Sequence, residues 1–120
     1  FQRCIAIEGS PIAVGDYVVN LDDFEHIEVY EGRVEDLLPS FDLQPDVVIM
    51  DPPRAGVHGK VVDWLAESEV PLVAYISCDP STLARDVKRM FQQGYQLQEM
   101  AMFDQFPQTY HIETISILTR

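Results

Sequence analysis

Residues 72–80 read Leu-Val-Ala-Tyr-Ile-Ser-Cys-Asp-Pro, an apolar run that enters a polar turn at Ser77. The run predicts a buried strand over residues 72–76, and the turn predicts the start of a helix. The apolar residues that recur at helical spacing after the turn are Leu83, Val87, Met90 and Phe91, with Gly94 as the natural end of the helix. A strand followed at once by an amphipathic helix is the building unit of an α/β sheet.

The same alternation extends outward in both directions. Further strands are predicted at residues 4–7, 27–30, 47–50, 95–102 and 112–118, and short helices at 34–38 and 60–68. A longer helix is predicted after Ser10 and Pro11, with an apolar face formed by Val14, Tyr17, Val18 and Leu21. The fold class is therefore α/β, a Rossmann-like sheet with helices on both faces.

Length and composition limit the organisation of the chain. With 120 residues and 47% hydrophobic side chains, residues 1–120 can form one compact core but not two independent domains. The sequence enters a strand at once, so we expect it to be part of a longer protein. No apolar stretch approaches the roughly 20 residues that span a bilayer, and no leader is visible. We expect a cytoplasmic protein that does not contact a membrane.

Charge and cysteine content narrow the function classes. Eight basic against twenty acidic residues give a formal charge of −12, which repels phosphate backbones and disfavours unaided nucleic-acid binding. If RNA is the substrate, most of the affinity must come from elsewhere. The two cysteines, Cys4 and Cys78, lie in unlike contexts, so neither a disulfide nor a metal site is expected.

Three polar residues directly follow predicted strands, where ligands of doubly wound sheets bind. They are Glu8, Asp51 and Cys78. Glu8 precedes a Gly-Ser-Pro turn, where a carboxylate can accept the hydroxyls of a ribose or simply complement the dipole of the next helix. A glycine-rich phosphate loop is missing, so a dinucleotide is not favoured.

Asp51 opens the sequence Asp51-Pro52-Pro53-Arg54. Two prolines fix an extended turn and hold the aspartate at the rim of the sheet, although prolines also simply end strands. The flanking charges favour a functional role, in which Arg54 pairs with an acidic neighbour or meets a phosphate.

Cys78 lies past its strand, in the turn that opens a helix. Free N–H groups at a helix start stabilise a thiolate, whereas buried cysteines usually act as small hydrophobes. Residue context alone leaves nucleophile and spectator equally open. We expect Ser81 or Thr82 to cap this helix.

His111-Ile112-Glu113 enters the last predicted strand. Glu113 can act as a general base if it is partly buried, and strand alternation places it on the face of Ile115 and Ile117. For His111 a role as a hydrogen-bonded loop residue is favoured. His26 and His58 are interpreted as structural residues only.

Together, three ordered motifs resemble the RNA uracil-C5 methyltransferase family. They are residues 51–56 (Asp-Pro-Pro-Arg-Ala-Gly), 75–86 (Tyr-Ile-Ser-Cys-Asp-Pro-Ser-Thr-Leu-Ala-Arg-Asp) and 103–113 (Phe-Asp-Gln-Phe-Pro-Gln-Thr-Tyr-His-Ile-Glu). Residues 7–9, Ile-Glu-Gly, are similar to the family's second-strand cofactor motif. The resemblance implies that residues 1–120 are the C-terminal part of a class I methyltransferase catalytic domain.

The resemblance also implies a mechanism. Cys78 adds to C6 of a uridine in rRNA or tRNA, C5 accepts the methyl group of S-adenosylmethionine, and Glu113 removes the C5 proton so that the thiolate can leave. Glu8 would bind the cofactor ribose, and Asp51 the methionine end of the cofactor or the target base. Uracil C5 needs addition at C6 before it becomes nucleophilic, which explains the need for a thiolate.

The sequence departs from the family pattern at three positions. Asp79 stands where Asn is usual and adds negative charge beside the thiol, Gln105 replaces a common Met, and Arg33 lies where a polar acceptor would meet the adenine, so adenine contacts stay unassigned.

The family's first strand and glycine-rich cofactor loop are also absent. The strands that end at Glu8 and Asp51 must therefore pair directly, leave a gap or borrow an edge from another copy, which makes self-association possible. We expect weak or no cofactor binding and no turnover from this chain alone.

Two other functions remain open. One is a noncatalytic Rossmann-like interaction module with an acidic surface, which a buried, inert Cys78 would favour. The other is an amino-group methyltransferase, because Asp-Pro-Pro also occurs there, but such sites place an aromatic residue where Arg54 stands and do not need Cys78.

Overall fold

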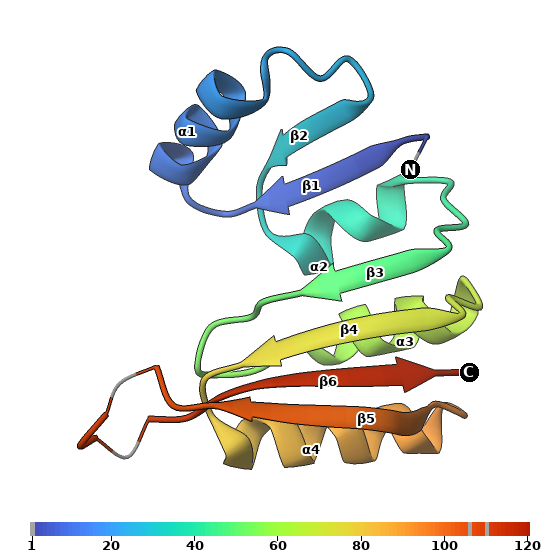
Figure 1. Ribbon diagram of the computed structural model, residues 1–120. Helices are drawn as coiled ribbons and strands as arrows, with labels where there is room; N and C mark the ends of the chain where they lie inside the picture. The colour runs from blue at the N-terminus through green and yellow to red at the C-terminus, as the bar shows by residue number, and fades with distance from the viewer. Residues whose placement is uncertain (1, 106, 110) are drawn as a thin grey trace. The chain divides into compact units, whose positions relative to one another are not determined.

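The computed structural model describes residues 2–105, 107–109 and 111–120. It divides into two compact units, Phe1–Asp42 and Leu43–Arg120, which are described one at a time (Figure 1). The α/β class predicted from the sequence is confirmed. In the described part of the chain, no helix has both the length and the apolar character that a membrane crossing requires.

The first unit is a βαβ unit followed by short helices. Its elements are β1 (Cys4–Glu8), α1 (Pro11–Leu21), β2 (Ile27–Glu31), α2 (Val34–Leu37) and the 3-10 helix η1 (Leu38–Ser40). β1 and β2 pair in parallel, with Cys4 opposite Ile27 and Glu8 opposite Glu31. Parallel neighbours need a crossover, and α1 supplies it.

The start of α1 agrees with the prediction, but its apolar face does not. Ser10 is the N-cap, and its side chain accepts a hydrogen bond from the Ala13 N–H at 3.4 Å. Of the four residues predicted to form the apolar face, Tyr17 and Val18 are 40% and 56% exposed. Helical spacing correctly identified apolar residues on one face of α1, but the first unit buries that face only in part.

The second unit is a four-stranded sheet with two helices. Its elements are β3 (Val47–Met50), α3 (Gly59–Glu67), β4 (Leu72–Ser77), α4 (Pro80–Gln92), β5 (Gln96–Phe103) and β6 (Glu113–Thr119). The strand order is β3-β4-β6-β5, in which β3 and β4 are parallel and β6 runs antiparallel to both of its neighbours. The predicted strand boundaries hold to within a residue or two. Gly94, with φ of +93°, follows α4 as expected.

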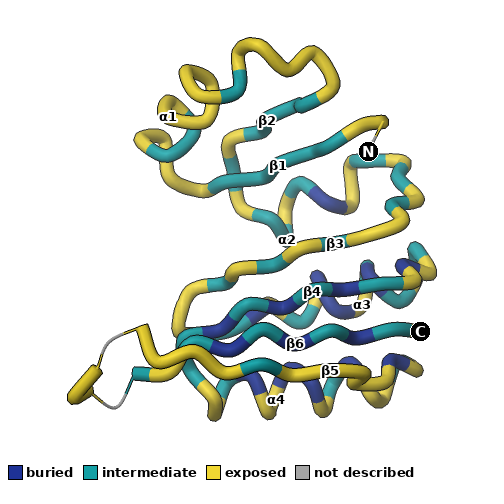
Figure 2. Tube along the Cα trace, in the orientation of Figure 1, coloured by how far each residue is buried: buried dark blue, intermediate teal, exposed yellow. Residues whose placement is uncertain are grey.

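The core of the second unit lies between the sheet and these helices. Figure 1 shows α3 and α4 on the same side of the sheet, and Figure 2 shows the buried residues alternating along β4 and β6. The residues buried there are Val73, Tyr75, Ser77, Thr114, Ser116 and Leu118 from the strands, Val61, Val62 and Leu65 from α3, and Leu83, Asp86, Val87 and Met90 from α4. Each large apolar side chain contributes roughly 1.5–3 kcal/mol on burial, so this layer holds the unit together.

Each unit has a sheet of its own. β1 and β2 form the two-stranded sheet of the first unit, and β3 is an edge strand of the four-stranded sheet of the second unit.

Candidate active site

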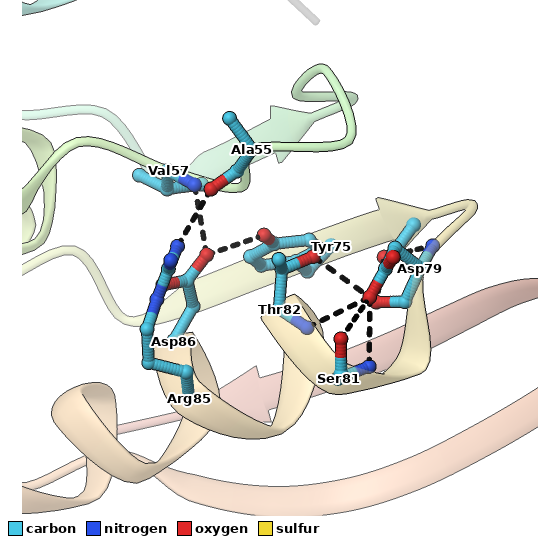
Figure 3. Close-up of polar contacts among 9 residues, drawn as sticks. Ala55, Val57, Tyr75, Asp79, Ser81, Thr82, Arg85 and Asp86 are labelled. Carbon is cyan, nitrogen blue, oxygen red and sulfur yellow. Dashed lines mark hydrogen bonds and ion pairs between the residues drawn. The ribbon is translucent and has the colours of Figure 1, made fainter.

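The turn between β4 and α4 is built around Asp79. Its carboxylate Oδ1 accepts hydrogen bonds from the Ser81 and Thr82 N–H groups, both at 2.9 Å, and from the Ser81 hydroxyl at 2.5 Å (Figure 3). The prediction that Ser81 or Thr82 caps α4 was wrong. The cap needs the extended backbone that Asp79 adopts, and Pro80 occupies the first turn of the helix.

The charge of Asp79 is directed at the helix. Hydrogen bonds from the Ser81 side chain and the Thr82 N–H lower the pKa of Asp79, which keeps its carboxylate ionised. A carboxylate at a helix start is also stabilised by the helix dipole. Asp79 therefore serves as the N-cap of α4.

Cys78 lies between two hydrogen-bonded neighbours. The Ser77 hydroxyl donates to the Asp79 carbonyl at 3.0 Å and accepts from the Asp79 N–H at 3.1 Å. The Ser77 carbonyl accepts from the Thr114 hydroxyl at 3.2 Å. These contacts fix the backbone on both sides of Cys78, whose side chain is a half-buried free thiol.

The pairing of β4 with β6 relates Cys78 to Glu113. Ser77, the last residue of β4, lies opposite Thr114, so Cys78 directly follows β4 at the end of the strand pair where Glu113 begins β6. The predicted alternation is confirmed, because Thr114 faces the buried side and Glu113 is half-buried on the other, with Ile115 and Ile117. Two residues 35 positions apart in sequence (113 minus 78) are thus at the ends of neighbouring strands.

Asp51 follows β3 at the same end of the sheet. The parallel register sets Met50 opposite Tyr75, so Asp51 comes at the level where β4 is about to end. Its side chain is exposed. The Arg54 guanidinium Nη2 lies 3.5 Å from the His111 ring Nε2, a long polar contact between the loop after β3 and the segment before β6. The sequence predicted that Arg54 contacts an acidic residue or a phosphate. In the structure Arg54 contacts His111.

Glu8 belongs to the first unit. It ends β1, and its Oε1 accepts from the Ser10 N–H at 2.7 Å. This contact orients the carboxylate at the start of α1, as both interpretations of Glu8 require. Arg33, the N-cap residue of α2, forms an ion pair with Glu35, and its Nε lies 3.9 Å from the Asp36 Oδ2.

Sequence reasoning missed two residues near this site, Asp86 and Arg85. Asp86 is fully buried in α4, where its carboxylate binds the Val57 N–H and the Tyr75 hydroxyl (Figure 3). The available signal was a charged residue three positions after Leu83 and four before Met90, inside the apolar stripe of the helix.

Among the described residues, no group of three His, Cys, Asp or Glu side chains is arranged to hold a metal ion.

The architecture defines the class of protein. A sheet in which the antiparallel β6 lies between β4 and β5, with polar residues at the ends of β3 and β4, is the Rossmann-like fold of S-adenosylmethionine-dependent methyltransferases. A solved structure of the Pyrococcus abyssi tRNA (uracil-54, C5)-methyltransferase in complex with S-adenosyl-L-homocysteine superposes with a TM-score of 0.84 and 28% identity. It matches 98% of this chain and 29% of that one.

Sequence comparison identifies the family. Residues 31–120 match the model of the tRNA (uracil-5-)-methyltransferase family, and the chain belongs to that family. An uncharacterized RNA methyltransferase of Enterococcus faecalis is 43% identical over 83% of this chain and 22% of its own length. One of Thermotoga maritima is 39% identical over 98% of this chain and 27% of its own length. The chain thus spans about a quarter of the length of these relatives.

Proposed function

We propose that the protein carrying this chain methylates C5 of a uridine in rRNA or tRNA, with Cys78 as the nucleophile and Glu113 as the base. The observation that carries the proposal is the β4–β6 register, in which Ser77 lies opposite Thr114, and the residue that follows Ser77 is Cys78 and the residue that precedes Thr114 is Glu113. A nucleophile and a base that act on adjacent atoms of one pyrimidine ring must lie close together. Family membership supports the substrate class.

The proposed reaction has three steps. The Cys78 thiolate adds to C6 and forms a C–S bond, which makes C5 nucleophilic. C5 then accepts a methyl group, which S-adenosyl-L-methionine would supply when bound; the sulfur–methyl bond would break and leave S-adenosyl-L-homocysteine. Glu113 then removes the C5 proton, the C5–C6 double bond returns, and the thiolate leaves. The target base has to be unstacked to reach the thiol.

The chemistry of two carboxylates fits the cofactor. Glu8 has one oxygen held by the Ser10 N–H, and a carboxylate oriented in this way suits the hydroxyls of a ribose. Asp51 is exposed at the end of β3, where an anion can meet the ammonium group of a methionine moiety or a donor of the target base. We assign Glu8 to the ribose and Asp51 to the methionine end or the base.

The nucleophile can be tested by trapping. A chimera in which this chain replaces the matching segment of the Thermotoga maritima relative is mixed with S-adenosyl-L-methionine and RNA that contains 5-fluorouridine. Fluorine cannot leave C5 as a proton does, so the covalent adduct should persist and be visible in a denaturing gel. Cys78→Ala should abolish the adduct, and Cys4→Ala is the matched control that retains it. An adduct that persists in Cys78→Ala would refute the assignment.

Glu113 is tested with ordinary RNA in the same chimera. Glu113→Gln cannot remove the C5 proton, so the methylated adduct should accumulate with unmodified uridine and turnover should stop. Normal turnover by Glu113→Gln would overturn its role as base.

We further propose that the 120-residue chain is inactive by itself and cytoplasmic, and that it self-associates. β3 is an edge strand whose Val47 and Ile49 are 50% and 71% exposed, and such edges pair with other strands. Sedimentation of the isolated chain should show a species larger than a monomer, and Ile49→Lys should reduce it. Methylation of RNA by the isolated chain would contradict its proposed inactivity, and a monomer at all concentrations would contradict the proposed self-association.

A further inference from the structure

A buried charge in α4 contacts the loop that carries Asp51. Asp86 has no exposed surface and follows Leu83 in the apolar stripe of the helix. A carboxylate in such a place is costly unless hydrogen bonds satisfy it. Its Oδ2 accepts from the Val57 N–H and from the Tyr75 hydroxyl, both at 2.8 Å (Figure 3).

Arg85 completes the contact from the same helix. Its Nε donates to the other oxygen of Asp86 at 2.9 Å, and its Nη2 donates to the Ala55 carbonyl at 2.8 Å. The pair therefore holds both the carbonyl of residue 55 and the N–H of residue 57, one on each side of Gly56. One ion pair thus binds a backbone acceptor and a backbone donor of the loop. These two contacts restrict the conformation of residues 55–57.

Gly56 shows how closely the loop approaches the helix. Its φ of +80° is a left-handed conformation that favours glycine, and its N–H donates to the Pro53 carbonyl at 2.8 Å. A Cβ at this position would collide with the Asp86 carboxylate and the Arg85 guanidinium. The loop backbone thus lies directly against the charged pair.

The same helix begins at the turn that holds Cys78. α4 starts at Pro80, and Tyr75 lies in β4 two residues before Ser77. Asp86 therefore joins three segments, which are the loop after β3, the strand that ends next to Cys78, and the helix that follows it. The pKa of Tyr75 is raised by burial and by its hydrogen bond to Asp86, which keeps its hydroxyl a donor.

We propose that Asp86, together with Arg85, is a positioning residue that fixes the loop bearing Asp51 and Arg54 relative to Cys78. The inference rests on the function proposed above. Asp86 contacts neither substrate nor cofactor in this role. It acts through the loop backbone, so its loss should weaken the step in which Asp51 takes part more than the chemistry at Cys78.

The kinetic test uses the chimera described above. Asp86→Asn keeps the size of the side chain but loses the charge that binds Arg85 and the Val57 N–H. We expect the KM of the ligand that Asp51 contacts, S-adenosyl-L-methionine or the RNA, to rise about tenfold, as for loss of a hydrogen bond to a charged group, and kcat at saturation to change less than about threefold. Tyr95→Phe is the matched control, because it removes a buried hydroxyl whose hydrogen bonds go to the Leu65 and Val70 carbonyls and not to the loop after β3. Two KM values that are both unchanged in Asp86→Asn, or a KM raised equally in Tyr95→Phe, overturn the proposal.

A second measurement does not depend on activity. In the 120-residue chain, hydrogen exchange at the Val57 amide should be at least about tenfold faster in Asp86→Asn than in the parent, with the α3 amides unchanged. If Asp86→Asn does not fold, Arg85→Gln at the exposed member of the pair should give a smaller change of the same kind. If the parent chimera forms no adduct, the proposed function fails, whereas Val57 exchange still decides the role of Asp86. Unchanged exchange in both variants refutes it.

Discussion

The two units of the chain differ in how much they bury. In the second unit, Leu65, Val70 and Met90 have no exposed surface, whereas Leu38 at 9% is the one buried residue among those described in the first (Figure 2). Two paired strands alone are marginally stable, while four strands under two helices make a core. The proposed catalytic pair therefore lies on the unit with its own core, and the proposed ribose ligand Glu8 on the unit without one.

The largest difference between the two units should appear in the free energy of unfolding when one leucine in each unit is replaced by alanine. Leu65→Ala empties a fully buried site in α3 and should lower the free energy of unfolding by about 3 kcal/mol. Leu21→Ala in α1 removes a half-buried side chain and should cost less than about 1 kcal/mol. Circular dichroism in urea measures both losses, and the fluorescence of Trp64, the only tryptophan, which lies in α3, follows the second unit by itself. Equal losses in the free energy of unfolding for Leu65→Ala and Leu21→Ala would contradict the difference in packing between the two units.

Two tyrosines sharpen the comparison at the level of hydrogen bonds. The buried Tyr95 hydroxyl lies 3.0 Å from the Leu65 carbonyl and 2.9 Å from that of Val70. Tyr95→Phe leaves both carbonyls buried and should cost about 2 kcal/mol. Tyr30→Phe removes a hydrogen bond to the Glu28 carboxylate that water can replace, and should cost clearly less than Tyr95→Phe. Urea unfolding of both variants checks the order, which a larger loss in Tyr30→Phe would reverse.

The helix cap predicts a dependence on pH. The folded-state pKa of Asp79 is depressed below its ordinary value of 3.8, so the cap stabilises the fold above that value and is lost as pH falls through the folded pKa. Asp79→Asn keeps a capping side chain that does not titrate. The stability of the parent relative to Asp79→Asn should be constant from pH 7 to about 5 and decline below about pH 4. Trp64 fluorescence in urea measures it, and a difference that grows on acidification would contradict the sign.

Glu28→Gln serves as the control in the first unit. Arg3 lowers the pKa of Glu28 in an exposed ion pair, which contributes little to stability. Its removal should leave the acid response of the Trp64 transition unchanged. A change as large as that from Asp79→Asn would mean that this transition does not report the second unit alone.

The smallest expected effect concerns a defect in the better-packed unit. The Ser116 hydroxyl is buried without a hydrogen-bond partner among the described residues. Ser116→Ala removes that unsatisfied group and should stabilise the second unit by up to about 1 kcal/mol. Calorimetric unfolding should show a higher Tm, and a clear loss of stability would mean that the hydroxyl is satisfied after all.

Residue patterns predicted the elements well but not how side chains share a turn. The strand at 47–50 and the alternation that sets Glu113 beside Ile115 depend on local period alone, which a sequence displays directly. The sequence predicted the wrong N-cap for α4, because Asp79, Ser81 and Thr82 are all residue types that cap helices well. Only the backbone geometry selects among them.

Long-range contacts were harder to predict. The hydrogen bond from Asp86 to Val57 spans 29 positions, and no local pattern encodes it. The half-covered face of α1 escaped prediction for a related reason, because helical spacing shows which residues are apolar and not whether anything packs on them. The four residues proposed for the site stay predictions, since their roles depend on a substrate and a cofactor.

The register between β4 and β6 also limits how the sequence can evolve. A single insertion between Glu113 and Ile115 would turn Glu113 to the helix side of the sheet while Ile115 and Ile117 kept their places. Alignment gaps among active members should therefore be absent from the few positions that follow Glu113.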